Sequence, residues 1–317
     1  MSYFIVVAVT ICIYAIQTVS LNMVVGYAGQ PNLAQSAFLG IGAYFAAILT
    51  TRYSVSFFWT IPISFAVTGA AGLVLGAISL RLRDDFLAIV TVGLNFVVVA
   101  VFAYVPFFGG AVGIYAIPLP SVAGYQFGNS DFLTVGLAML AVVVAASFYM
   151  ERTWFGGSLK AIKDDERAAA SVGIPVAGYK VLAFVLSAAF AGMAGSLYAP
   201  FVSTVTPTSF GFIESIVILS MLIFGGLGTI RGALVGAVVL GALPEVFRFA
   251  SNYRLLVFGL ILVLMLRFQP QGLLGEGSFL ARVGRRVLHS GRRARPIGMA
   301  AADGSVGNGS IPDCDSE

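Results

Sequence analysis

The sequence predicts an all-α, polytopic integral membrane protein with about nine transmembrane helices, in a range of about eight to ten. Hydrophobic residues make up 59% of the 317 residues and charged residues only 10%, whereas about 25% of the residues in soluble domains are charged. Apolar runs of about 20 residues, long enough to cross a bilayer as a helix, recur along the chain. The runs are continuous rather than alternating, and a helix satisfies all their backbone groups in lipid, so a β-barrel is disfavoured.

Nine apolar runs are expected to form the spans. The first six contain no Asp, Glu, Lys or Arg, and the last three are shorter or carry a single acid. The last run is the shortest, but Arg254 and Arg267 flank it and their side chains can extend to the two membrane interfaces. In chain order, the expected spans are 3–30, 33–51, 57–80, 86–106, 132–150, 181–200, 212–230, 232–247 and 255–266.

The distribution of basic residues predicts the topology. All three lysines, Lys160, Lys163 and Lys180, lie in or beside the segment 151–179. Placing this segment in the cytoplasm puts 15 of the 18 basic residues inside, as the positive-inside rule requires. The loop 107–131, which has no Lys or Arg, then faces outward. Nine spans place the N-terminus outside and the C-terminus in the cytoplasm.

The C-terminal segment 276–317 is expected to be a disordered, basic cytoplasmic tail. It combines an arginine cluster with a Gly, Ser and Asp-rich end and shows no hydrophobic periodicity. Its arginines either contact anionic membrane lipid or serve only as a positive-inside signal.

The composition argues against several function classes. The one histidine, His289, lies in the tail, and the two cysteines, Cys12 and Cys314, have no metal-binding spacing, so neither a metal nor a cofactor site is expected. There is no G-x-x-x-x-G-K-[ST] loop, so any ATP would be hydrolysed by another chain. Since little sequence remains outside the expected spans, we expect a transport subunit rather than an enzyme, and no nucleic-acid partner.

Two groups of polar residues are candidates for a translocation pathway. Gly29, Gln30, Asn32 and Gln35 surround Pro31 and interrupt the apolar pattern between the first two runs. A broken backbone at membrane depth is tolerated where protein or a watered cavity satisfies it, so this segment is either a pore-lining elbow or an ordinary cytoplasmic turn.

Asn95 and Glu214 lie within later apolar runs. A carboxylate costs about 2.5–3.5 kcal/mol at the centre of a span and is by default a functional candidate. The alternative for Glu214 is a position at the membrane interface, where water reaches it.

Small residues spaced four apart predict close helix packing. The three sets are Gly72 with Gly76, Ala188 with Gly192 and Ser196, and Gly228 with Gly232 and Gly236.

The cytoplasmic segment 151–179 predicts an amphipathic helix over residues 158–172. Ser158 is expected to cap it, and Gly173 is expected to end it in a left-handed conformation before Pro175. Such a helix favours docking in a groove of another protein, and the alternative is a helix that lies on the membrane surface. Its expected apolar face consists of Leu159, Ile162, Ala169 and Val172.

Part of this segment resembles the coupling loop of ABC-importer permeases: Glu166, then Ala169-Ala170, then Gly173. Together with further motifs in the same order, the chain resembles the branched-chain amino-acid ABC transporter permease family, LivM-like type, from about residue 20 to residue 275. These motifs are Gly26-Tyr-Ala-Gly-Gln, Phe38-Leu-Gly-Ile-Gly-Ala-Tyr44, Leu80-Arg-Leu-Arg83, Leu87-Ala-Ile-Val-Thr91, Leu182-Ala-Phe-Val-Leu-Ser-Ala188, Ser209-Phe-Gly-Phe212, Gly225-Gly-Leu-Gly228 and Pro270-Gln-Gly-Leu-Leu274.

The resemblance implies a permease domain over residues 1–275 in a bacterial inner membrane. It implies import of a small amino acid, with branched-chain amino acids first, by ATP-driven alternating access. The implied partners are a sister permease subunit, two ABC ATPase subunits and a periplasmic substrate-binding protein. The residues implied to couple to the ATPases are Lys163, Asp164, Glu166, Arg167, Ala169, Ala170 and Gly173.

The chain also departs from the family pattern. Gln35 stands where members often have His, and Phe96 and Val99 stand where an acid and a base are common. These differences leave the substrate open, with urea, short amides and other small solutes as alternatives. A self-contained channel or secondary carrier is the rival hypothesis, and it leaves the helix at 158–172 unexplained.

Overall fold

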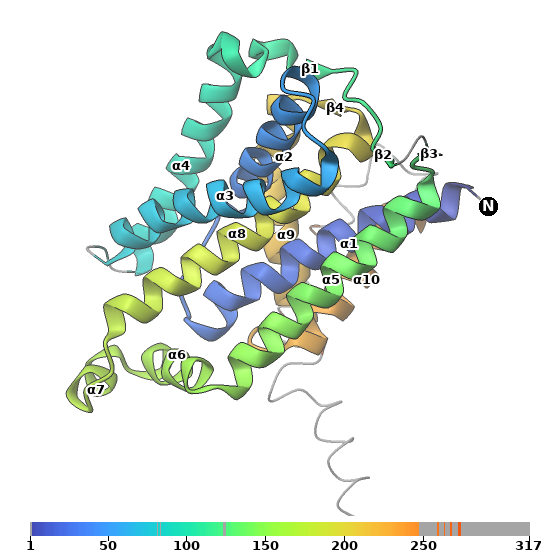
Figure 1. The fold of residues 1–317 in the computed structure, drawn as a ribbon. Coiled ribbons are helices and arrows are strands. Elements are labelled where there is room, and N and C mark those ends of the chain that lie inside the picture. Colours follow the sequence, from blue (N-terminus) through green and yellow to red (C-terminus); the bar gives the residue numbers. More distant parts are fainter. Residues whose placement is uncertain are drawn as a thin grey trace, which may run out of the picture.

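Helices dominate the computed structural model, which describes residues 2–80, 82, 84–122, 125–246 and the single positions 259, 263, 267, 272 and 273 (Figure 1). The predicted tail at 276–317 therefore lies outside the described residues. The predicted span at 255–266 also lies outside them, except for positions 259 and 263. The α-helices are α1 (Ser2–Leu21), α2 (Gln35–Arg52), α3 (Phe57–Ser79), α4 (Asp84–Tyr104), α5 (Asn129–Arg152), α6 (Trp154–Asp164), α7 (Glu166–Ser171), α8 (Val176–Val202), α9 (Phe212–Gly225) and α10 (Ile230–Val246).

Short elements connect these helices. A π-helix, η1 (Asn22–Tyr27), continues α1, and the 3₁₀-helices are η2 (Pro106–Phe108), η3 (Gly110–Val112) and η4 (Pro207–Phe210). The strands are β1 (Ile114–Tyr115), β2 (Ser121–Val122), β3 (Tyr125–Gln126) and β4 (Thr204–Val205). β1 pairs antiparallel with β4, with Ile114 opposite Val205, and β2 pairs antiparallel with β3.

Six helical segments in the described part of the chain are long and apolar enough to cross a membrane, so the protein is a multi-pass, all-α membrane protein. The predicted count of nine is not confirmed. Of the other three expected spans, 33–51 forms the buried helix α2 and 232–247 forms the shorter helix α10, while only residues 259 and 263 of the span 255–266 are described. The six segments are Tyr3–Tyr27, Phe57–Ser79, Phe86–Tyr104, Asn129–Arg152, Val176–Val202 and Pro207–Gly225.

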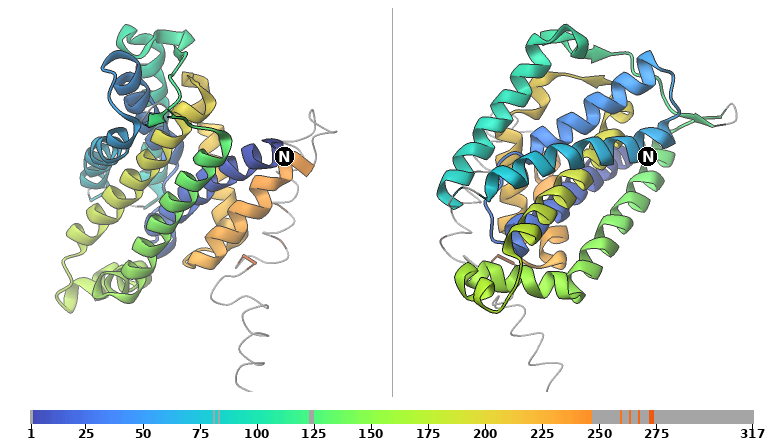
Figure 2. Two further views of the ribbon diagram at one scale, coloured as in Figure 1. Left: turned by 45° about the vertical axis from the view of Figure 1, so that its right-hand side comes forward. Right: turned by 60° about the vertical axis from the view of Figure 1, so that its left-hand side comes forward.

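Helix α8 runs through the middle of the bundle between α1, α2 and α3 (Figures 1 and 2). Its small residues allow this position. A Cβ on Gly42 of α2 would overlap the backbone of Gly192 of α8, and a Cβ on Gly72 of α3 would meet Ala188 of α8 at 2.5 Å. The predicted close packing at these small residues is therefore confirmed.

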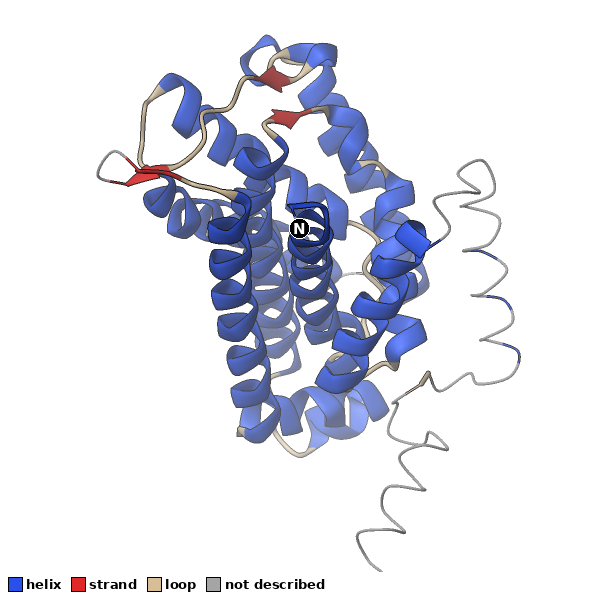
Figure 3. Cartoon of the chain, turned by 90° about the vertical axis from the view of Figure 1, so that its right-hand side faces the viewer, coloured by secondary structure: helices blue, strands red, loops and turns tan. Residues whose placement is uncertain are grey.

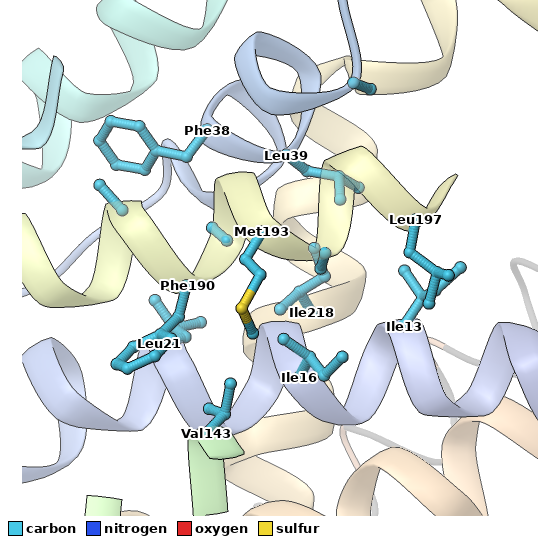
Figure 4. Packing of buried hydrophobic residues seen from close by; sticks show 14 of the residues in the cluster. Ile13, Ile16, Leu21, Phe38, Leu39, Val143, Phe190, Met193, Leu197 and Ile218 are labelled. Atoms are coloured by element: carbon cyan, nitrogen blue, oxygen red, sulfur yellow. The ribbon is translucent and has the colours of Figure 1, made fainter. Parts of the chain in front are cut away.

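The apolar core forms where α8 meets its neighbours. Phe190, Met193 and Leu197 on α8 are buried together with Ile16 of α1 and Val143 of α5 (Figure 4). Because these contacts involve helices far apart in the sequence, they fix the bundle that positions the polar groups described below.

The bundle has two distinct ends. The strands β1 and β4 and the 3₁₀-helices gather at one end, which we call the β1–β4 end (Figures 1 and 3). Helices α6 and α7 lie at the opposite end, between the ends of α5 and α8, and we call it the α6–α7 end (Figure 1). Helix α1 runs from near the β1–β4 end toward α6, so its residues mark depth along the bundle.

Candidate functional site

A break in the helices lies between α1 and α2, as the sequence predicts. The π-helix η1 ends at Tyr27, and the next seven residues are not helical until α2 begins at Gln35. Gly29 has φ +70°, a left-handed conformation that favours glycine. Gln30 and Asn32 are buried in this segment. The break thus brings polar side chains and free backbone groups inside the bundle.

Gln35 forms the centre of one polar cluster. Its Nε2 donates to Ser20 Oγ at 2.8 Å and to the Gln17 carbonyl at 3.3 Å. Its Oε1 accepts from Asn32 Nδ2 at 3.3 Å and from Ser187 Oγ at 3.4 Å. All five residues are buried, so side chains from α1, α2, α8 and the break satisfy one another inside the bundle.

A second cluster surrounds Ser36, the next residue on α2. The hydroxyls of Ser36 and Ser215 lie 2.6 Å apart, and Ser36 Oγ also donates to the carbonyl of Phe210 at 3.1 Å. Asn95 Nδ2 of α4 donates to Ser36 Oγ at 2.7 Å. Ser36, Asn95 and Ser215 are buried, so α2, α4 and α9 meet at a polar contact.

Glu214 precedes Ser215 and contacts α1. Tyr14 donates its hydroxyl to Glu214 Oε1 at 2.7 Å. Both residues line a cavity of about 250 Å³ between α1, α2, α8, η4 and α9. Its other lining residues are Thr10, Ile13, Leu39, Tyr198, Phe201, Val202 and Ser209.

These groups form one polar column along α1. We define the polar column as Tyr14 with Glu214, the Ser36 cluster, the Gln35 cluster and Gln30. Tyr14, Gln17 and Ser20 succeed one another at a spacing of three residues, which keeps them near one side of α1. The rise of an α-helix places Tyr14 and Ser20 about 9 Å apart along the axis of α1, with Ser20 nearer the break. The column therefore extends from the cavity toward the α6–α7 end.

Several amide atoms of the column have no partner among the described protein atoms. They are Gln17 Oε1, Asn95 Oδ1 and both amide atoms of Gln30. A buried polar atom without a hydrogen bond costs about 1–3 kcal/mol. Sites of this kind are suited to water or to a polar solute, because either supplies the missing hydrogen bonds.

The predicted pathway residues are placed as follows. Asn32, Gln35, Asn95 and Glu214 take part in the column, and Gln30 is buried with its amide unpaired. Gly29 instead packs on the α6–α7 end, where its Cβ position lies 2.8 Å from Lys163 Cγ.

The sequence analysis did not identify several members of the polar column. The signal for them was weak, since single hydroxyl or amide side chains are common in apolar helices; they are Tyr14, Gln17, Ser20, Ser36, Ser187 and Ser215.

The predicted helix over 158–172 is wrong in its bounds, because the segment folds as two helices. Asp165 has an extended backbone, with φ −156° and ψ 109°, between α6 and α7. Its Oδ1 accepts from the backbone N–H of Arg167 at 2.8 Å and of Ala168 at 3.0 Å, so it caps α7. Ser158 lies inside α6 and does not cap it. Gly173 ends the segment with φ +86°, as predicted.

The interruption at Asp165 between α6 and α7 changes which residues of this segment face outward. Leu159, Ile162 and Ala169 are buried in this chain, whereas Val172 is 76% exposed, so the four residues do not share one face as predicted. Six of the seven predicted coupling residues are exposed, and Ala169 is the buried one. Trp154, at the start of α6, is 91% exposed. The α6–α7 end thus presents charged groups together with exposed apolar side chains.

Two lysines connect α6 and α7 to the bundle through a hydrogen bond and an ion pair. Lys163 Nζ donates to the carbonyl oxygen of Gly26 in η1 at 2.9 Å. Lys180 of α8, which is buried, pairs with Glu166 of α7 at 2.6 Å. The Lys163 contact joins α6 directly to the π-helix, which leads into the break and the polar column.

The π-helix also contacts the loop between α9 and α10. The N–H of Gly228 donates to Asn22 Oδ1 at 2.9 Å, and a Cβ on Gly26 would lie 2.8 Å from Gly228 N. Beyond α10, the N–H of Leu273 donates to the carbonyl of Phe224 at 3.0 Å.

Among the residues described, no group of three or more His, Cys, Asp or Glu residues could hold a metal ion.

Comparisons with known proteins match most of the chain. A family model described as "branched-chain amino acid transport system / permease component" matches residues 3–266. The high-affinity branched-chain amino acid transport system permease protein LivM of Salmonella typhimurium is 36% identical over 293 residues, covering 84% of this chain and 69% of its own. The LivM protein of Escherichia coli is 35% identical with the same coverage. The probable permease LivH of Methanocaldococcus jannaschii is 26% identical over 273 residues, covering 77% and 83%. No solved structure matches significantly.

Proposed function

Because the chain belongs to the family of branched-chain amino acid transport system permease components, we propose that it is a membrane-spanning subunit of an ABC importer. Its cargo is a small amino acid, with branched-chain amino acids first, as the names of the relatives suggest. The chain hydrolyses no ATP itself, and two separate ATPase subunits supply the energy. Relatives named LivM and LivH both match this chain, which supports pairing with a related sister permease.

The importer works by alternating access. ATPase closure moves α6 and α7, and this movement reaches the bundle through Lys163 and Gly26. The hydrogen bond between these two residues is the observation that carries the mechanism, because it joins the exposed helices to the break beside the polar column. A periplasmic binding protein delivers the amino acid at the β1–β4 end. The polar column then replaces the water that a zwitterion loses on entering the bundle.

The docking surface for the ATPases is tested at Val172, which is exposed at the end of α7. Val172→Asp places a carboxylate on that surface without disturbing the core. The matched control is Val112→Asp at the β1–β4 end, where the valine is also exposed (65%, against 76% for Val172). We expect normal membrane levels of both variants and loss of copurifying ATPase and of ATP-driven leucine uptake only for Val172→Asp. Wild-type uptake by Val172→Asp, or leucine transport without any ATPase, would favour a self-contained channel or carrier instead.

Ala169, which the resemblance implies to be a coupling residue, is unsuited to this test. Ala169 is 3% exposed and packed within this chain, so a carboxylate there would disturb the permease itself. Val172 and Ala170 present the exposed alternative positions on α7 and its end.

The topology is part of the proposal. The protein lies in a bacterial inner membrane with the α6–α7 end and the C-terminus in the cytoplasm, and it has nine spans, of which α2, α10 and 255–266 complete the six described above. Residues 1–275 form the permease domain and 276–317 a basic cytoplasmic tail. Ser171→Cys and Val112→Cys, in a chain with both native cysteines replaced, test this orientation. Impermeant reagent added outside should label only position 112, and labelling of position 171 would reverse the topology.

The cargo is tested by reconstituting the importer with its binding protein. Uptake of radiolabelled leucine, isoleucine and valine is compared with uptake of urea and acetamide. We expect the three amino acids to compete with one another and urea not to compete. Transport of urea or acetamide in preference to leucine would reassign the cargo and keep the permease role.

A further inference from the structure

A pocket lies at the corner where α5 ends and α6 begins, at the α6–α7 end of the bundle (Figure 1). We propose that this pocket binds the phosphate of an anionic phospholipid, with Arg152 and the first turn of α6 as its partners. The ligand is a component of the membrane rather than cargo, so the site goes beyond the proposed function. Only the leaflet, the cytoplasmic one, rests on the proposed topology.

The pocket has the size and the charge for a lipid headgroup. Its volume of about 450 Å³ equals roughly fifteen waters at about 30 Å³ each, which leaves room for a phosphate and the glycerol attached to it. One lining residue, Arg152, carries a formal charge at neutral pH, so the pocket favours an anion. The lining residues are Arg152, Thr153, Trp154, Gly157, Ser158 and Ile174.

The guanidinium of Arg152 is available to a ligand. It lies over the ring of Phe148, 4.1 Å from the ring centroid, and within the described part of the chain it pairs with no carboxylate. The neighbouring carboxylate of Glu151 instead pairs with Lys160 at 3.5 Å. A guanidinium binds a phosphate through two parallel N–H donors. Arg152 therefore keeps both its charge and its donors for an anion.

The start of α6 adds backbone donors to the same pocket. Thr153 is the N-cap residue, but its side chain does not cap the helix, because its hydroxyl donates to the carbonyl of Met150 at 3.0 Å. The N–H groups of Trp154 and Phe155 thus have no acceptor among the described residues. The first turn of a helix carries a partial positive charge, and its free N–H groups suit a phosphate oxygen.

Ser158 supplies a polar group that this chain leaves without a partner. It is 9% exposed and lines the pocket, yet its hydroxyl makes no hydrogen bond to any described residue. Other helical serines donate to the carbonyl three residues earlier; examples are Ser79, Ser171 and Ser196. A buried hydroxyl without a hydrogen bond costs about 1–3 kcal/mol. A phosphate oxygen in the pocket would accept this hydroxyl.

The residues beside the pocket favour a lipid over a soluble anion. Arg152 follows Phe148 by one turn on α5, so the two share a helix face, and Phe148 and Tyr149 are both exposed at the end of this span. Trp154, which lines the pocket, is 91% exposed. Exposed aromatic residues at the end of a span are typical of the membrane interface, where lipid headgroups lie. Basic pockets at this level bind anionic headgroups.

Two changes in the pocket have matched controls elsewhere in the chain. Arg152→Gln removes the charge, and its control is Arg52→Gln, because Arg52 also lies in the last turn of a helix and over an aromatic ring, that of Phe107 at 5.0 Å. Gly157→Asp places a carboxylate in the pocket. Its control is Gly178→Asp near the start of α8, since a Cβ at either glycine has no neighbour within 4 Å.

The importer, complete with its ATPases, is purified in detergent and titrated with phosphatidylglycerol, phosphatidylcholine or glycerol phosphate. Native mass spectrometry counts the bound molecules, and thermal unfolding without added lipid checks the fold. We expect phosphatidylglycerol to bind wild type and both controls, and to bind Arg152→Gln and Gly157→Asp at least about fivefold more weakly. The four variants should unfold at similar temperatures, and phosphatidylcholine should bind wild type more weakly than phosphatidylglycerol does.

Unchanged phosphatidylglycerol binding by Arg152→Gln and Gly157→Asp, or an equal loss in the two controls, would overturn the site. Equally tight binding of phosphatidylcholine would show that the anionic charge is not recognised. Displacement of the lipid by an equal concentration of glycerol phosphate would reassign the pocket to a soluble phosphate. Loss of copurifying ATPase from Arg152→Gln with unchanged lipid binding would assign it to an acidic side chain of the ATPase. None of these measurements uses transport, so a failure of leucine uptake would overturn the proposed function alone.

Discussion

The ammonium group of Lys163 donates a hydrogen bond to the carbonyl oxygen of Gly26 at 2.9 Å, across 137 positions of sequence. This contact joins α6, outside the bundle, to the π-helix that leads into the break before α2. Gly29 packs against the same lysine side chain. The contact therefore links α6 closely to the segment that contains Gln30 and Asn32.

Lys163→Met should uncouple ATP hydrolysis from uptake. The methionine keeps much of the packing against Gly29 but cannot donate to Gly26. A partly exposed charged hydrogen bond is worth about 1 kcal/mol, so we expect roughly a fivefold fall in leucine imported per ATP hydrolysed. The ratio is measured in liposomes that contain the whole importer. Lys163→Arg, which can still donate, should restore most of it, and an unchanged ratio in Lys163→Met would deny the contact a role in coupling.

Gly42→Ala should destabilise the bundle at the crossing of α2 and α8. The added Cβ would overlap the backbone of Gly192, which cannot move without shifting α8. Overpacking of this kind costs about 1–3 kcal/mol. Gly93→Ala on α4 is the matched control, because a Cβ there has no neighbour within 4 Å. Thermal unfolding in detergent should show a lower midpoint for Gly42→Ala alone, and equal midpoints would mean that the helices do not approach this closely.

Asn95→Leu should reduce transport more than assembly. The change removes the donor to Ser36 Oγ, but one hydrogen bond between membrane helices contributes only about 0.6 kcal/mol on average. We therefore expect nearly normal amounts of folded complex and a several-fold loss of leucine uptake. Thr60→Val is the control, since Thr60 is buried on α3 and bonds only to Phe57 of its own helix. Equal losses of assembly and uptake would assign Asn95 to packing.

Gly173→Val should disturb the turn from α7 into α8. The position has φ +86° and no neighbour within 4 Å of a Cβ, so the cost comes from the backbone rather than from crowding. A left-handed conformation costs an ordinary residue about 1–2 kcal/mol. Gly173→Asn, which tolerates this conformation, should keep ATPase copurification close to wild type while Gly173→Val reduces it. Identical copurification in the two variants would show that the turn does not position the docking surface.

The long apolar runs predicted most of the fold because a membrane span needs little more than length and hydropathy. The run at 33–51 forms a helix as expected, yet α2 is surrounded by protein and falls outside the six segments that qualify by hydropathy. The small residues at Gly72 and Ala188 predicted a close helix crossing, and the structure places them in contact across α3 and α8. Small residues spaced four apart form a local pattern, so a single sequence is enough to predict where helices pack closely.

The site was harder to predict because its contacts are distant in sequence. Tyr14 and Glu214 lie 200 residues apart, and although Glu214 stands out as an acid in an apolar run, nothing in the sequence indicates Tyr14 as its partner. The break at Asp165 had a local signal, since Asp is a good helix cap, but the surrounding helix-forming residues favoured one continuous helix. As a result Ala169 and Val172 were assigned to one apolar face, whereas Ala169 is buried within this chain and Val172 is exposed.

The π-helix at the end of α1 gives the protein a way to turn its chain by a fixed step. A π turn holds about one residue more than an α turn, and each residue of an α-helix corresponds to about 100° of rotation. If Asn22–Tyr27 rewound into α-helix, Gly26 and Tyr27 would swing by about this angle while Gln17 stayed in place. The hydrogen bond from Lys163 to the Gly26 carbonyl would be lost, and the non-helical segment that follows would rotate about the axis of α1. Such a screw-like step needs no helix to slide along its neighbour, so the tight glycine contacts of α8 need not open during the cycle.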